Sequence, residues 1–115
     1  MELPSQADLL RIFIGEGDQY KGKPLYEAIV LLAREKGLAG ATVLKGVMGF
    51  GLHSRIHTAK ILRLSEDLPI IIEIVDKPDR IQAILPDING MIQEGLVTLE
   101  KVNVVAYRHK AQQST

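Results

Sequence analysis

The sequence predicts an α+β domain of the ferredoxin-like βαββαβ type, a sandwich in which a four-stranded antiparallel sheet carries both helices on one face. Two observations predict this fold. Four short, apolar, β-rich segments are bounded by glycine and proline, and two segments with apolar residues at helical spacing separate them. A length of 115 residues suits one domain. We therefore predict a single domain over residues 1–115, with a folded core at 8–108 and a polar tail at 109–115.

The first strand is predicted over residues 9–14, which are mostly apolar and are followed by Gly15 and Gly17. A turn-rich connection, 16–23, leads to Pro24, which suits the first position of a helix. Apolar residues then recur at helical spacing until Gly37, which is a suitable left-handed cap.

The second strand is predicted over residues 40–50, where Gly46 and Gly49 indicate a bulge or a close backbone approach. The connection that follows, 51–67, is polar and basic at first and then alternates in a way that could extend a hairpin. Residues 68–75 form a nearly continuous apolar strand, broken only by Glu73, for which we expect a basic partner on a neighbouring strand or subunit.

The second helix is predicted to begin with Asp76 as its N-cap and Pro78 in its first turn. Pro86 should kink or restart this helix, because proline removes one backbone donor and crowds the preceding turn. The last strand is predicted over residues 97–107.

Composition excludes several classes of function. Lys plus Arg equals Asp plus Glu at 14 each, so the chain has no net charge with which to hold nucleic acid or an acidic membrane. Five scattered aromatic residues are too few for a base-stacking surface, and the absence of cysteine excludes thiolate chemistry. No apolar run approaches ~20 residues, and the N-terminus lacks a signal pattern, so we expect a cytoplasmic protein. No catalytic constellation is visible, and we predict that the chain is not an enzyme.

Apolar residues occupy both faces of the predicted strands. Residues 12–14, 70–72 and 104–106 are consecutive apolar runs, whereas a sheet with one solvated face should alternate. Two helices cover only one face, and the polar tail is unsuited to covering the other. The pattern therefore predicts a closed homo-oligomer.

Three motifs stand at the expected element boundaries: REKGLAG at 34–40, GATVLKGVMGFG at 40–51 and LPIIIEIVD at 68–76. Together they resemble the PII signalling family. The run from 49 to 76 is more similar still to a PII-like family known as domain of unknown function 190. The resemblance spans residues 9 to about 107.

This resemblance implies a homotrimer with ligand clefts between subunits. It implies a nucleotide site near Gly49, Phe50 and Gly51, for which AMP, ADP or ATP are the expected ligands. It also implies a loop at 52–67 that contacts a partner, a membrane transporter being one candidate.

Several PII features are absent. The Gly-Asp-Gly-Lys signature is replaced by INGMIQEGLVTLEKV, and the C-terminal Arg-Thr-Gly-Glu element is missing. No tyrosine lies between Gly51 and Leu68, and Leu52 and His53 stand in place of the glutamine that helps to bind 2-oxoglutarate. The ligands of PII proteins therefore do not carry over directly.

Two clusters are candidate binding sites for a small anion. The first lies in the 16–23 connection, where glycines and lysines precede a helix N-terminus: Gly17, Lys21, Gly22 and Lys23. The alternative is an ordinary solvated loop, since Glu16 and Asp18 oppose an anion. The second combines a strand lysine with loop donors: Lys45, Ser54, Arg55, His57 and Thr58. A mobile basic loop is the alternative there.

His53 and His57 could also bind a metal, since at this spacing they share one face of a helix. On an extended chain they would lie about 13 Å apart, too far for one ion. A trimeric metal-tolerance protein with a site shared between subunits is thus the alternative function. A phosphatase, which this fold also hosts, needs an arginine on the first loop, where none stands.

Overall fold

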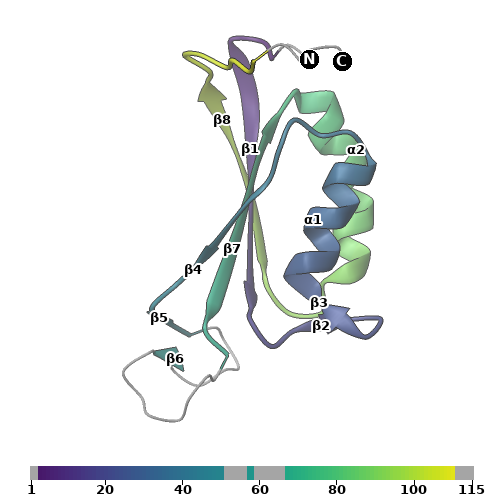
Figure 1. The fold of residues 1–115 in the computed structure, drawn as a ribbon, viewed down its shortest axis with the longest axis vertical. Helices are drawn as coiled ribbons and strands as arrows, with labels where there is room; N and C mark the ends of the chain where they lie inside the picture. The colour runs from purple at the N-terminus through teal and green to yellow at the C-terminus, as the bar shows by residue number, and fades with distance from the viewer. Residues whose placement is uncertain (1–2, 51–56, 59–66, 111–115) are drawn as a thin grey trace.

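The computed structural model describes residues 3–50, 57–58 and 67–110 (Figure 1). Its main sheet contains β1 (Gln6–Gly15), β4 (Thr42–Lys45), β7 (Pro69–Asp76) and β8 (Leu96–Asn103). The spatial order is β4-β7-β1-β8, and every neighbouring pair is antiparallel. Helices α1 (Leu25–Glu35) and α2 (Pro78–Met91) cover one face of this sheet. The predicted fold class is confirmed.

Two short ribbons lie at the lower end of the molecule in Figure 1. One is the hairpin of β2 (Gln19–Tyr20) and β3 (Lys23–Pro24), which leads directly into α1. The other pairs β5 (Met48–Gly49) with β6 (His57–Thr58), beyond the end of β4.

The core lies between the helices and the two central strands. β7 alternates strictly between half-buried and buried residues, and its register with β1 places isoleucine opposite leucine or isoleucine at three successive inward positions. Burying each large aliphatic side chain contributes roughly 1.5–3 kcal/mol. The side chains with less than 2% exposure include Leu10, Ile12, Ile29, Ile72, Ile74, Ile81, Ile84 and Ile88.

The opposite face of the sheet carries an apolar row. The registers place one residue of each strand in line across the sheet: Leu44, Ile71, Phe13 and Leu96. Leu44 and Leu96 are exposed and the two central residues are half-buried, because no helix covers this face. The consecutive apolar residues of β1 and β7 thus divide between the core and this row. The third run, 104–106, lies after the end of β8 and belongs to no strand.

The predicted second strand is divided by the structure. Thr42–Lys45 joins the main sheet, whereas Met48–Gly49 leaves it to pair with β6. Gly46 marks the division: a Cβ there would lie 2.7 Å from Pro69 Cγ. A Cβ on Gly49 would lie 3.0 Å from the same atom, so of the two alternatives predicted for these glycines the close approach is confirmed.

The remaining differences concern element ends. Pro24 was predicted to be the first helical residue of α1 but is its N-cap, and the helix begins at Leu25. Gly37 has the expected positive φ of 75°. The N-cap of α2 is Lys77 instead of Asp76, and the helix runs on through Pro86 without restarting, with that proline on its exposed side. The last strand ends at Asn103, four residues before its predicted end.

Candidate functional site

Three segments that are distant in sequence meet at the lower end of the sheet. They are the turn 15–18 after β1, the end of β4 at 45–46, and residues 67–69 at the start of β7. The amide of Glu16 donates to the carbonyl of Leu68 at 2.8 Å, and the amide of Gly46 donates to the carbonyl of Pro69 at 2.7 Å. Backbone hydrogen bonds therefore hold both ends of the 46–68 connection against the sheet. We call these three segments the loop base.

The amides of the 15–18 turn already donate to carboxylates. The amide of Gly15 donates to Asp18 Oδ2 at 2.9 Å, and the amide of Gly17 donates to Asp67 Oδ1. Asp67 stands 50 residues further along the chain. This second bond therefore joins the turn after β1 to the segment that precedes β7. The glycine-rich turn was predicted to hold an external anion; in this structure two of the chain's own carboxylates occupy its donors.

Lys45, a predicted ligand residue, lies at the loop base and pairs with Glu16, Nζ to Oε2 at 2.9 Å. The lysine is exposed and the glutamate is half-buried. A pair of this kind contributes about 0–1 kcal/mol to stability, since water screens it. It places an ammonium group beside the 15–18 turn.

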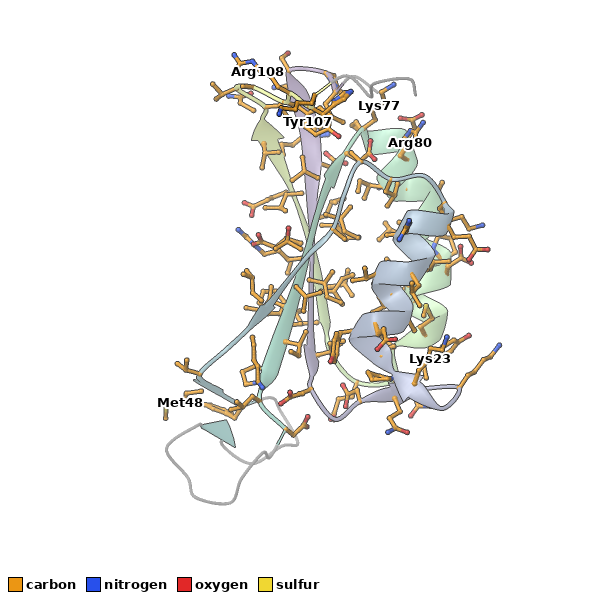
Figure 2. All side chains as sticks on the ribbon, viewed as in Figure 1. Lys23, Met48, Lys77, Arg80, Tyr107 and Arg108 are labelled. Atoms are coloured by element: carbon orange, nitrogen blue, oxygen red, sulfur yellow. The ribbon has the colours of Figure 1, made fainter. Side chains whose placement is uncertain are left out.

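Lys21, Gly22 and Lys23 are exposed at the tip of the β2–β3 hairpin, where Lys21 and Gly22 both have positive φ. In Figure 2, Lys23 and Met48 project on opposite sides of the molecule. The hairpin lysines therefore lie away from Met48 within one chain, whereas Gly17 of the same predicted cluster directly follows Glu16, the ion-pair partner of Lys45.

The N-terminus of α1 has few free donors for an anion. Pro24 has no N–H group, the amide of Leu25 donates to the carbonyl of Asp18 at 2.8 Å, and Glu27 supplies a negative charge in the first turn. Pro24 and Leu25 therefore offer no free amide to an anion, which leaves the later amides of the first turn and the lysine side chains of the hairpin.

Beside the loop base, β5 and its neighbours present apolar side chains to solvent. Val47 is 75% exposed and Phe50 is 73% exposed, and Met48 between them is also exposed. Gly49, another predicted ligand residue, lies in this ribbon opposite His57, and Met48 lies opposite Thr58. Gly51, His53, Ser54 and Arg55 lie outside the described residues, as do the side chains of His57 and Thr58, so the second cluster and the metal pair stay predictions.

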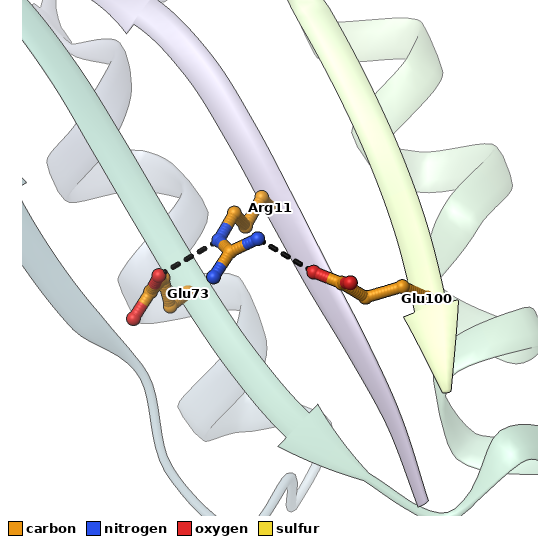
Figure 3. A network of polar contacts seen from close by, with 3 residues as sticks. All are labelled: Arg11, Glu73 and Glu100. Carbon is orange, nitrogen blue, oxygen red and sulfur yellow. Dashed lines mark hydrogen bonds and ion pairs between the residues drawn. The ribbon is translucent and has the colours of Figure 1, made fainter. Parts of the chain in front are cut away.

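A charged triad lies on the uncovered face of the sheet (Figure 3). Arg11 Nε donates to Glu73 at 2.9 Å and its Nη1 donates to Glu100 at 2.6 Å, so β1 is joined to both of its neighbours. The hydrogen bond to Glu73 raises the pKa of Arg11 above its ordinary value. The expected basic partner of Glu73 is thus Arg11. Glu100 gave no signal in the sequence, because its place beside Arg11 depends on the register of β8.

Two buried carboxylates at the upper end of the sheet were also missed as a pair. Asp8 and Asp76 stand opposite each other in the β1–β7 register, and both side chains are almost fully buried. Asp76 accepts from the amides of Ala39 at 2.8 Å and Lys77 at 2.7 Å, and Asp8 pairs with Lys101 at 3.3 Å. The signal available in the sequence was an aspartate near the start of one central strand and another at the end of the other.

Two kinds of feature are absent from the described residues, a cluster of metal ligands and a membrane-spanning helix. Among these residues, no group of three His, Asp or Glu side chains is placed to hold a metal ion. Neither described helix is long and apolar enough to cross a membrane. A groove lined by Leu3, Ser5 and residues 104–109 lies at the upper end, where the terminal segments meet, away from those predicted ligand residues that the structure describes.

Comparisons with known proteins agree with this fold. The model of the family described as "Uncharacterized ACR", domain of unknown function 190, matches residues 7–104. A UPF0166 protein of Aquifex aeolicus is 40% identical over 97 residues, which is 84% of this chain and 91% of that protein. A UPF0166 protein of Methanocaldococcus jannaschii is 36% identical over 100 residues, covering 86% and 92% of the two chains.

Among solved structures, the chain is similar to CPII, a nitrogen regulatory PII-like protein from Thiomonas intermedia bound to ADP, AMP and bicarbonate. The TM-score is 0.64 at 17% identity, covering 86% of this chain and 94% of that one. A second structure of CPII with the same ligands has a TM-score of 0.59 at 16% identity, covering 86% and 88%. At this identity the likeness is one of fold.

Proposed function

This chain belongs to the domain of unknown function 190 family, and from that premise we propose that it is a PII-like regulatory protein. It binds a small anionic ligand, an adenine nucleotide in the first instance, in clefts between the subunits of a homotrimer. It acts by binding and not by catalysis. The loop at 52–67 contacts the regulated partner, for which a membrane transporter is one candidate.

The observation that carries this proposal is the exposed apolar surface beside the loop base. Val47, Met48 and Phe50 project into solvent next to an edge strand, and the row from Leu44 to Leu96 crosses the uncovered sheet face. Soluble proteins seldom leave adjacent apolar surfaces of this kind uncovered. A second copy of the chain on the sheet face and a planar ligand base against Phe50 would cover both.

The fold likeness supports the choice of ligand. CPII, which shares this fold, binds ADP, AMP and bicarbonate. Lys45 at the loop base and Lys23 on the hairpin are exposed basic groups, and in the proposed trimer they contact the phosphate from two neighbouring subunits.

The loop base supports a regulatory role. Both ends of the 46–68 connection are hydrogen-bonded to the same end of the sheet, so a ligand bound there contacts the two points from which the loop leaves. A ligand that binds one arrangement of the loop better than another shifts its population by that difference in affinity.

The first test is isothermal titration of the purified oligomer with AMP, ADP and ATP, with and without magnesium, after light scattering has given its mass. We expect three times the chain mass of 12.7 kDa and dissociation constants in the micromolar range. An oligomer that binds none of the three nucleotides would overturn the nucleotide proposal, and a monomer would overturn the clefts.

A variant pair locates the ligand. Phe50→Ala should weaken nucleotide binding about tenfold, since base–aromatic stacking contributes ~1–3 kcal/mol. Leu31→Ala is the matched control, because Leu31 is an exposed apolar residue on α1 away from the loop base. Equal effects of the two substitutions would show that Phe50 makes no direct contact.

A further inference from the structure

The 15–18 turn holds a carboxylate that comes from a distant part of the chain. Asp67 accepts a hydrogen bond from the amide of Gly17, and both of its oxygens lie against Gly15. A Cβ on Gly15 would lie 2.7 Å from each oxygen, and a Cβ on Gly17 would lie 3.1 Å from one of them. The two glycines therefore form a cradle in which a planar oxyanion fits and side chains do not.

We propose that this cradle is an oxyanion site of the ligand-binding cleft, occupied in the free protein by Asp67 and filled by the planar oxyanion of a ligand when Asp67 leaves. The proposal rests on the proposed function, because it assigns the cradle to the same cleft. It adds the chemical class of one ligand group, a carboxylate or bicarbonate. It also identifies the Asp67 carboxylate as a group of the chain that competes with this ligand for the cradle.

Three properties of the cradle suit exchange. Gly17 is exposed and Asp67 is half-buried, so water and a small anion can reach the hydrogen bond between them. Backbone amides bind the shape of a carboxylate whatever molecule carries it. The ammonium of Lys45 pairs with Glu16, the residue between the two glycines, and so brings a positive charge to the turn.

Charge opposes the site as well as supporting it. Asp18 also accepts from this turn, through the amide of Gly15, and Glu16 offsets Lys45. A free anion must therefore displace Asp67 and approach two further carboxylates. We expect weak binding to the unmodified protein and a clear gain when Asp67 is removed.

Displacement would also act on the loop. Asp67 stands two residues before β7, where the 46–68 connection returns to the sheet. Its bond to Gly17 is one of the contacts that hold this return, beside the bond from Glu16 to Leu68. An anion that takes the place of Asp67 therefore removes one restraint on the loop and leaves the backbone bonds in place.

The test is a titration of the isotope-labelled full-length protein with bicarbonate, acetate and inorganic phosphate, followed at the backbone amide signal of Gly17. Asp67→Ala should bind bicarbonate or acetate at least about tenfold more tightly than the unmodified protein, because the internal competitor is gone. Asp67→Asn, which keeps an acceptor but loses the charge, should lie between the two and serves if the alanine variant folds poorly.

Gly15→Ala gives the opposite prediction and makes the test decisive. Its new methyl group displaces Asp67 but also fills the cradle, so acetate and bicarbonate should bind no more tightly than to the unmodified protein. Asp87→Ala is the matched control for charge, since this exposed aspartate lies on α2 and its removal should change affinity less than twofold.

The proposal is overturned if Asp67→Ala gains no affinity for any of the three anions, or if Gly15→Ala gains as much as Asp67→Ala. A gain for phosphate alone would overturn the planar class of ligand. Nucleotide titration of the unmodified protein separates this result from the proposed function. If nucleotides bind but Asp67→Ala gains no affinity for anions, only the oxyanion-site proposal fails. If Asp67→Ala gains affinity but no nucleotide binds, only the nucleotide proposal fails.

Discussion

Asp76 is the last residue of β7 and Asp67 stands two residues before its start, and both carboxylates accept hydrogen bonds from backbone amides in different surroundings. Each carboxylate accepts a backbone amide from a segment far away in sequence, Ala39 for Asp76 and Gly17 for Asp67. Asp76 has 0% exposure and holds a second amide, that of Lys77. Asp67 is half-buried and faces an exposed glycine. Burial therefore decides which bond is a fixed part of the fold and which can be exchanged for a ligand.

The comparison predicts its largest effect at Asp76. Asp76→Ala removes a fully buried carboxylate and leaves the amides of Ala39 and Lys77, which are partly buried, without their acceptor. Each unsatisfied buried donor costs about 1–3 kcal/mol, so we expect a loss of about 3–5 kcal/mol in the free energy of unfolding. Urea denaturation at fixed protein concentration measures it. A loss below 1 kcal/mol would contradict the assigned role.

A smaller effect is expected at the neighbouring buried acid. Lys101→Ala removes the cation that pairs with Asp8, and since the lysine side chain is 72% exposed, water can partly replace it. We expect a loss of about 1–2 kcal/mol, below the range for a fully buried pair. Lys36→Ala is the control, because its contact with Asp87 joins two exposed side chains at 4.0 Å.

Asp67→Ala should destabilise the protein by only about 1 kcal/mol, because water can satisfy the amide of Gly17 once the carboxylate is gone. The same urea experiment compares the free energies of unfolding of Asp67→Ala and Asp76→Ala. If the two variants lost equal stability, the distinction between a fixed and an exchangeable carboxylate would fail.

The smallest effect is expected at the ion pair of the loop base. Glu16→Gln breaks the contact with Lys45 and should change the free energy of unfolding by less than about 0.5 kcal/mol, with the difference vanishing in concentrated salt. A thermal melt at low and high ionic strength tests this. A large loss that survives high salt would mean that Glu16 acts through packing instead of charge.

The candidate site was predictable in part from the sequence. Gly46 and Gly49 indicated a bulge or a close backbone approach, Gly17 was assigned to an anion site, and Lys45 was grouped with the donors of the following loop. The occupant of the glycine turn was not predictable, because Asp67 reaches it across 50 residues and no local pattern records the contact. The triad of Arg11, Glu73 and Glu100 was missed in part for the same reason, since its members meet only through strand register.

Local residue patterns alone determined the order of strands and helices, the apolar faces of both helices and the left-handed cap at Gly37, since each depends on neighbours within a few residues. They also sufficed to indicate the family. Only the folded chain decided that the second strand divides at Gly46, that Asp76 is buried and Asp67 half-buried, and that an apolar row crosses the uncovered face. Those features depend on which strands become neighbours and on what covers them, and that depends on contacts between residues far apart in the chain.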